Sequence, residues 1–252
     1  MRKVAIFVEG HTELIFVREF LLRVFDYQNI SLECYNLFTD YNFHETDYSF
    51  PNREHNKTTF YFQIINVGND NAVLSRILKR EKYMWNSGFH TIIGLRDMYG
   101  KSYREEAKNA QIYEELNQLF KEATQEQIDK RAIQPNNIHF LFAIMEVEAW
   151  FLGFEDVFEQ IDEKLTAEYI NEKLGFNLRN INPETAFFHP ADTLNDIYVL
   201  ANLSYKKKSK EINSLVSKID KDDYALLDMS EKCASFSEFY EIILRQKKEF
   251  DS

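Results

Sequence analysis

Residues Lys3 to Glu13 read KVAIFVEGHTE, and this stretch decides the fold. Its first half is an apolar run from Val4 to Val8, which has the length of a β-strand covered on both faces, as in a parallel sheet. The run ends at Glu9, where a charge leaves the core, and Gly10 permits a tight reversal of the backbone. Thr12 can cap the helix that follows. The stretch therefore predicts a strand, a sharp turn and an amphipathic helix.

The same alternation continues along the chain. Further apolar runs predict strands at residues 32–38, 60–67, 89–95 and 138–144, and helical patterns lie between most of them, the longest over residues 103–130. This order is typical of an α/β protein with a mostly parallel central sheet flanked by helices. Beyond residue 154 only helices are predicted. We expect a core over residues 1–153 and a mainly helical C-terminal extension over residues 154–252, packed on the core.

Charge, cysteine content and hydropathy narrow the classes of protein to which the chain could belong. The 252 residues carry a formal net charge of −11, so the whole surface does not attract nucleic acid, whose binding would need a local basic groove or metal ions. Cys34 and Cys233 lie far apart in no metal-ligand spacing, which predicts two free thiols and a reducing compartment. No apolar stretch has membrane length, and the N-terminus lacks a signal-peptide cleavage pattern. We therefore expect a soluble cytoplasmic protein.

Acidic residues stand where three of the five predicted strands end. Glu9 and Glu13 flank the first turn, Asp97 follows the fourth strand, and Glu146 and Glu148 follow the fifth. Open α/β sheets bind ligands at the carboxyl ends of their strands, and right-handed crossovers would bring the ends of the first and fourth strands to one edge. Clustered carboxylates suit Mg²⁺ or Mn²⁺. Each acid taken alone could equally be a solvated strand end or a favourable charge in a first helical turn.

Two other features could contribute to a site. Residues 204–210, SYKKKSK, form the densest basic cluster, which could face a phosphate ligand or could simply be a solvated helix start. The polar loop at residues 39–59 is too long for a plain connection, so it is either a hairpin excursion or a functional loop. Its His44 and His55 are candidate ligands or acid–base groups, with solvent-exposed loop histidines as the favoured interpretation.

Three segments resemble the motifs of a Toprim domain, the metal-binding α/β module shared by topoisomerases, bacterial primases and the overcoming-lysogenization-defect (OLD) nucleases. These segments are VEGHTE at residues 8–13, IIGLRDMYG at residues 92–100 and MEVEAWFLG at residues 145–153. Within that superfamily the chain looks most like the small stand-alone Toprim proteins found beside an ABC-type or SMC-like ATPase in bacterial anti-phage defence loci. The resemblance is firm up to about residue 150 and weaker beyond it.

The resemblance implies roles for individual residues. Glu9 matches the glutamate of the family's first motif, and Glu13 matches an acid that also serves the metals in the nuclease branch. The second motif is Asp-x-Asp, in which Asp97 matches the first position and Tyr99 occupies the second. A tyrosine hydroxyl is a poor ligand for Mg²⁺, so a two-metal site would lack one carboxylate unless an acid from residues 145–153 replaces it. The implied metal ligands are Glu9, Glu13, Asp97 and one of Glu146 or Glu148.

The activity implied by the resemblance is hydrolysis of a phosphodiester in DNA or RNA, tRNA included, with Mg²⁺ or Mn²⁺ as cofactor. Glu9 and Asp97 would be catalytic, and Lys206 and Lys208 would stabilise charge in the transition state. The implied role is that of a nuclease effector in anti-phage defence, controlled by the ATPase. Two alternatives stay open: a non-catalytic Toprim-fold partner of the ATPase, and a primase-like nucleotidyl transferase. The sequence also leaves open whether the protein is a monomer or a homodimer.

Overall fold

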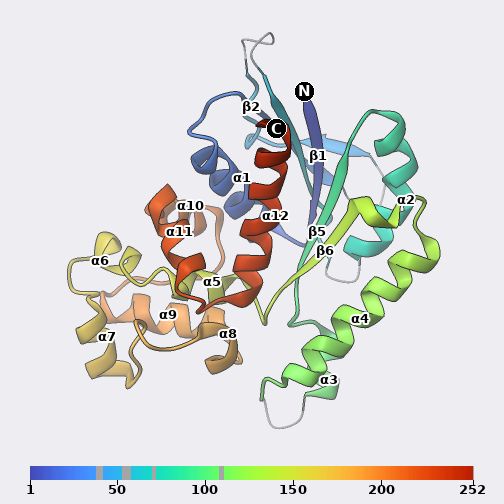
Figure 1. The fold of residues 1–252 in the computed structure, drawn as a ribbon. Helices are drawn as coiled ribbons and strands as arrows, with labels where there is room; N and C mark the ends of the chain where they lie inside the picture. The colour runs from blue at the N-terminus through green and yellow to red at the C-terminus, as the bar shows by residue number, and fades with distance from the viewer. Residues whose placement is uncertain (38–41, 53–57, 70–71, 108–110, 252) are drawn as a thin grey trace. The chain divides into compact units, whose positions relative to one another are not determined.

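The structure is a computed structural model that describes residues 1–37, 42–52, 58–69, 72–107 and 111–251 (Figure 1). The chain divides into two compact units. The first comprises residues 1–96 and 115–142, and the second comprises residues 97–114 and 143–252. The domain boundary predicted after residue 153 stays a prediction.

A six-stranded sheet organises the first unit, with the strand order β3-β2-β4-β1-β5-β6. β1 pairs in parallel with both β4 and β5, β2 pairs in parallel with β4, and β3 is antiparallel to β2. The strands are β1 Arg2–Val8, β2 Ile30–Leu37, β3 Phe43–Glu45, β4 Phe60–Asn66, β5 Thr91–Asp97 and β6 Ile138–Ala143. The predicted α/β class with a mostly parallel sheet flanked by helices is confirmed.

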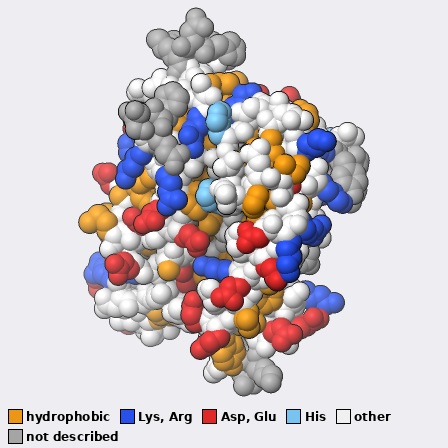
Figure 2. Space-filling model, turned by 45° about the vertical axis from the view of Figure 1, so that its right-hand side comes forward, with side chains coloured by type: hydrophobic (Ala, Val, Ile, Leu, Met, Phe, Trp, Pro, Cys, Tyr) orange, Lys and Arg blue, Asp and Glu red, His pale blue; other side chains and the backbone are white. Residues whose placement is uncertain are grey.

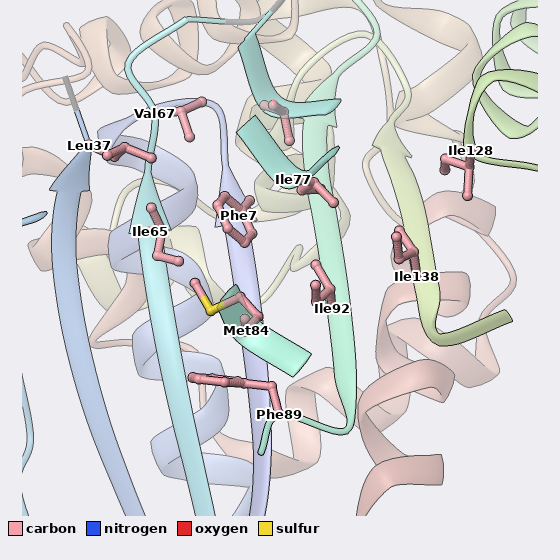
Figure 3. Close-up of a cluster of buried hydrophobic side chains, with 12 residues drawn as sticks. Phe7, Leu37, Ile65, Val67, Ile77, Met84, Phe89, Ile92, Ile128 and Ile138 are labelled. Atoms are coloured by element: carbon pink, nitrogen blue, oxygen red, sulfur yellow. The ribbon is translucent and has the colours of Figure 1, made fainter. Parts of the chain in front are cut away.

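One face of the sheet packs against α2 (Val73–Asn86). Phe7 of β1 and Ile65 of β4 belong to a buried cluster that also contains Ile77 and Met84 of α2 (Figure 3). Full burial of an aliphatic or aromatic side chain stabilises the fold by roughly 1.5–3 kcal/mol. Because β1 is buried on both faces, its apolar run is unbroken and shows no alternation.

The opposite face packs against α1 (His11–Val24) and the residue that follows it. The ring of Phe25 lies 4.8 Å from that of Phe60 and 5.5 Å from that of Phe62, centroid to centroid. Side chains alternate along a strand, so these even-numbered residues of β4 point away from the α2 face. The prediction that Thr12 caps this helix was wrong. The helix starts at His11, so Thr12 lies inside its first turn and Gly10 is the N-cap residue, which has no side chain that could form a cap.

Two other predictions are resolved by the structure. The loop after β2 is a hairpin excursion, since β3 pairs with β2 and places His44 opposite Asn36, whereas His55 lies outside the described residues. The prediction of a single helix over residues 103–130 was wrong. α3 (Lys101–Glu106) is followed by Ala107, whose backbone is extended, and α4 (Glu114–Arg131) is a separate helix.

The second unit is helical. Its remaining helices are α5 Val147–Gly153, α6 Val157–Ile161, α7 Ala167–Leu174, α8 Pro183–Ala186, α9 Pro190–Leu200, α10 Ser209–Val216, α11 Lys221–Met229 and α12 Ala234–Asp251. The ring of Trp150 packs 5.7 Å from each of Phe236 and Phe239, which anchors α5 to α12. The structure has no strand among the described residues beyond 154, as predicted. Within the described part of the chain, every helix is too short or too polar to span a membrane.

Burial of both cysteines gives a testable expectation. Cys34 and Cys233 are buried free thiols, as predicted. Burial raises the pKa of the Cys34 thiol to about 12 and that of Cys233 well above its ordinary value. Because the thiolate is the reactive species, native protein near neutral pH should react only slowly with a disulfide reagent such as DTNB, and denatured protein should titrate both thiols at once. Rapid reaction of the native protein would contradict this packing.

Candidate functional site

Three acidic side chains converge in the second unit. Asp97 is the last residue of β5, and Glu146 and Glu148 follow β6. One carboxylate oxygen from each lies within 4.8 Å of the other two. Asp97 is 7% exposed and Glu148 is fully buried. The structure therefore brings together three of the five acids predicted as metal ligands.

A sharp turn between β6 and α5 positions Glu146 and Glu148. Met145 has a φ of +63°, which is uncommon for a residue other than glycine. The N–H of Glu146 donates to the carbonyl of Ile144 at 3.0 Å across this turn, and the N–H of Tyr99 donates to the carbonyl of Met145 at 2.8 Å. Glu146 becomes the N-cap residue of α5. Strained backbone of this kind is found preferentially at functional sites.

Backbone N–H groups hold two of the carboxylates in place. Asp97 Oδ1 accepts a hydrogen bond from the N–H of Val147 at 3.0 Å, in the first turn of α5. Glu146 Oε2 accepts one from the N–H of Ala191 at 3.1 Å, in the first turn of α9. The first N–H groups of a helix have no partner inside the helix. Each acid therefore also has a structural role at a helix start.

Glu148 is held differently. Its Oε1 accepts a hydrogen bond from the hydroxyl of Tyr205 at 2.9 Å, and Tyr205 is itself buried. Its Oε2 receives no aligned hydrogen bond from the described residues and lies 3.1 Å from Lys207 Nζ. Burial raises the pKa of Glu148, and the positive charge of Lys207 opposes that rise. A buried carboxylate with so few donors is costly in free energy.

Lys207 is the cation of this cluster. Its Nζ lies 3.0 Å from Glu146 Oε1 as well as 3.1 Å from Glu148 Oε2, and its side chain is 39% exposed. Burial disfavours the ammonium, but Glu148, Glu146 and Asp97 outweigh this effect and raise the pKa of Lys207 above its ordinary value. When all four groups are ionised, three negative charges and one positive charge leave a formal charge of −2.

The neighbouring lysines contact Glu211 through their backbone. Lys206 and Lys208 are exposed, and the backbone N–H of each donates to Glu211 Oε2, at 2.6 and 3.2 Å. The sequence indicated the basic segment but not which lysine meets the acids, and it gave no signal for Tyr205. The catalytic roles proposed for Lys206 and Lys208 stay predictions.

Glu9 and Glu13 belong to the first unit. β1 and β5 pair in parallel, with Val8 opposite Leu95, so the two strands end at the same edge of the sheet. The backbone N–H of Glu9 donates to the carbonyl of Leu95 at 3.2 Å. Glu13 is buried, and a Cβ atom at Gly10 would lie only 3.0 Å from its Oε2, so glycine leaves room for this carboxylate. That Glu9 and Glu13 act with the acids of the second unit stays a prediction.

Tyr99, where the sequence resemblance to Toprim domains implies a second aspartate, packs against aromatic rings. Its ring meets the rings of Phe188 and His189 edge-on, at centroid distances of 5.4 and 5.2 Å. The guanidinium of Arg104 lies 5.2 Å from the centroid of the same ring. Aromatic and cation–π contacts therefore surround the side chain.

Another buried carboxylate, Glu184, was not expected from the sequence. Its Oε1 accepts hydrogen bonds from Trp150 Nε1–H at 3.1 Å and from Ser235 Oγ–H at 2.5 Å, and the backbone N–H of Ser235 donates to both oxygens. Burial raises the pKa of Glu184, and these donors oppose the rise. This carboxylate is satisfied by the protein, in contrast to Glu148.

Charge is mixed on the face drawn in Figure 2, where acidic and basic side chains are interspersed. A ligand with phosphate groups would therefore rely on local contacts more than on long-range attraction.

Substitution Tyr205→Phe tests the support of Glu148. It removes the hydroxyl that donates to a fully buried carboxylate, so we expect metal-free protein to lose about 1–3 kcal/mol of unfolding free energy in urea. Tyr83→Phe is the matched control, because Tyr83 is 60% exposed, and it should cost less than about 0.5 kcal/mol. Equal stability of both variants would show that the hydroxyl does not stabilise the site.

Comparison with known proteins gives one match. No curated protein and no solved structure matches the chain. The family described as "Domain of unknown function (DUF4276)" matches residues 8–243, a span that contains every acid and lysine of the candidate site. Since this match covers nearly the whole chain, the protein belongs to the DUF4276 family.

Proposed function

We propose that the protein is a Mg²⁺- or Mn²⁺-dependent nuclease that hydrolyses phosphodiester bonds in DNA or RNA. The observation that carries this proposal is the state of Glu148. Its carboxylate is fully buried, its Oε2 has no aligned hydrogen bond from the described residues, and ligand atoms of Asp97 and Glu146 lie within 4.8 Å. Its ionic contact is with Lys207 Nζ at 3.1 Å, and a divalent cation would compensate more of the negative charge of the three carboxylates than this single ammonium does.

The residues present fit a divalent cation. Asp97, Glu146 and Glu148 offer the hard carboxylate oxygens that Mg²⁺ and Mn²⁺ prefer. Opposite ligands of an octahedral Mg²⁺ ion stand roughly 4 Å apart, so ligand atoms within 4.8 Å of one another need only a small inward movement. Bound ions of this kind polarise a phosphoryl oxygen and lower the pKa of a water molecule.

The protein's own groups would orient the reaction. The N–H groups of Val147 and Ala191 fix Asp97 and Glu146, and the hydroxyl of Tyr205 fixes Glu148. The exposed Lys206 and Lys208 are suited to contact phosphates of a nucleic acid, because contacts to phosphate position the substrate. Lys207 supplies a positive charge beside the carboxylates.

The biological role within this proposal rests on the resemblance to Toprim proteins alone. We infer that the nuclease is the effector of an anti-phage defence system and that an ABC/SMC-like ATPase controls it. A net charge of −11 fits an effector that binds nucleic acid weakly until it is assembled with a partner.

A second candidate function has specific support. Lys207 lies between Glu146 and Glu148, and Tyr99 packs against aromatic rings where the Toprim pattern would have an acid. Both features suit a protein in which the acids serve only to hold the fold. In that case the chain would be a non-catalytic Toprim-fold partner of the ATPase.

Substitutions in the cluster distinguish the two functions. We expect Asp97→Asn and Glu148→Gln to reduce Mn²⁺-dependent cleavage of plasmid, single-stranded DNA or tRNA by about 100-fold or more, since a single electrostatic group in an active site is often worth roughly that factor. Glu163→Gln removes an exposed carboxylate and is the control. Gel assays with and without the ATPase, with circular dichroism to verify folding, make the measurement. If the wild type cleaves and both variants cleave at the same rate, the assignment of the site is refuted.

Substitution Glu9→Gln tests the part of the proposal that comes from the resemblance. If Glu9 acts with Asp97, this variant should lose cleavage to the same extent as Asp97→Asn while it retains the wild-type unfolding midpoint. Undiminished cleavage by Glu9→Gln would show that the acids of the second unit act without it.

A further inference from the structure

Lys207 holds the two oxygens that a cation would use. Its Nζ is in contact with Glu146 Oε1 at 3.0 Å and with Glu148 Oε2 at 3.1 Å. A divalent cation bound to the same oxygens at roughly 2.1 Å would lie close to the ammonium. Two positive charges at such a separation repel each other strongly where water is scarce. The ammonium and the cation therefore exclude each other from these oxygens.

The segment that carries Lys207 allows its side chain to leave. Tyr205 is buried and its N–H donates to Asn195 Oδ1 at 3.0 Å, while the N–H groups of Lys206 and Lys208 both donate to Glu211. The backbone is thus anchored on both sides of Lys207, whose φ is +52°. Its side chain is 39% exposed, so it can swing into solvent while the anchored backbone stays in place.

We propose that Lys207 is an internal competitor for the metal site: its ammonium contacts Glu146 and Glu148 in the metal-free protein, and a divalent cation displaces it. This inference rests on the metal site of the proposed function. It adds that Lys207 sets how much cation is needed to fill the site. Once displaced, the ammonium faces solvent beside the site, where it can contact an anionic ligand.

The unfavourable burial of Glu148 supports exchange over a permanent ion pair. Among the described residues, the fully buried Oε2 has an ionic contact with Lys207 and no aligned hydrogen bond. Asp97, whose ligand oxygen lies within 4.8 Å of the other acids, adds a third negative charge. When the three carboxylates and the ammonium of Lys207 are all ionised, a formal charge of −2 remains. A divalent cation compensates more of this charge than a single ammonium does, which provides the driving force for exchange.

Calorimetric titration with Mn²⁺ tests the competition. Lys207→Met removes the competitor and should bind Mn²⁺ at least about tenfold more tightly than the wild type, a factor that equals about 1.4 kcal/mol. Lys206→Met and Lys208→Met remove the same charge from exposed neighbours and should leave the affinity within about twofold. Equal or weaker binding by Lys207→Met would overturn the proposal, since it would mean that Lys207 supports the site.

Chemical labelling of the wild-type protein tests the displacement without a substitution that could impair folding. With acetic anhydride and mass spectrometry, the rate of modification of Lys207 should rise at least about fivefold on addition of Mn²⁺, relative to Lys206 in the same sample. An unchanged rate while Mn²⁺ is bound would overturn the displacement and leave the metal site intact. Failure of Mn²⁺ to bind would overturn both, and binding with displacement but no cleavage would overturn the nuclease alone.

Discussion

The burial of one incompletely compensated carboxylate, that of Glu148, is the constraint on which the site depends. Taking a carboxylate out of water costs several kcal/mol unless donors or cations replace the water. The chain replaces the water around Glu184 with the indole of Trp150 and the groups of Ser235. Around Glu148 the residues that the structure describes provide the hydroxyl of Tyr205 and the ammonium of Lys207. This difference between the two acids is the basis on which we propose that Glu148, and not Glu184, binds a cation.

Much of the arrangement could be predicted because it follows from local rules. The apolar run of β1 requires cover on both faces, and this requirement predicts a parallel sheet with helices on either side. Acids that directly follow such strands are carried to the sheet edge, which is why Asp97, Glu146 and Glu148 could be selected from the sequence. The parallel pairing of β1 with β5 confirms that these strands end at one edge.

The rest depends on contacts that no local pattern contains. Three consecutive lysines are equivalent in the sequence, and the positive φ of Lys207 together with the bonds from its neighbours to Glu211 makes it the one that meets the acids. Glu146 and Glu148 lie close together after a turn at Met145 that is neither strand nor helix. Glu184 reaches Trp150 across 34 residues of sequence, a separation at which periodicity carries no information.

Above all, we propose that Asp97, Glu146 and Glu148 form a cation site from which Lys207 is displaced. The decisive experiment is a crystal structure of the protein soaked in Mn²⁺, with anomalous scattering recorded. We expect an anomalous peak bounded by the three carboxylates, with Lys207 Nζ withdrawn from Glu146 and Glu148. A crystal that shows no peak there, with both contacts of Lys207 intact, would contradict it.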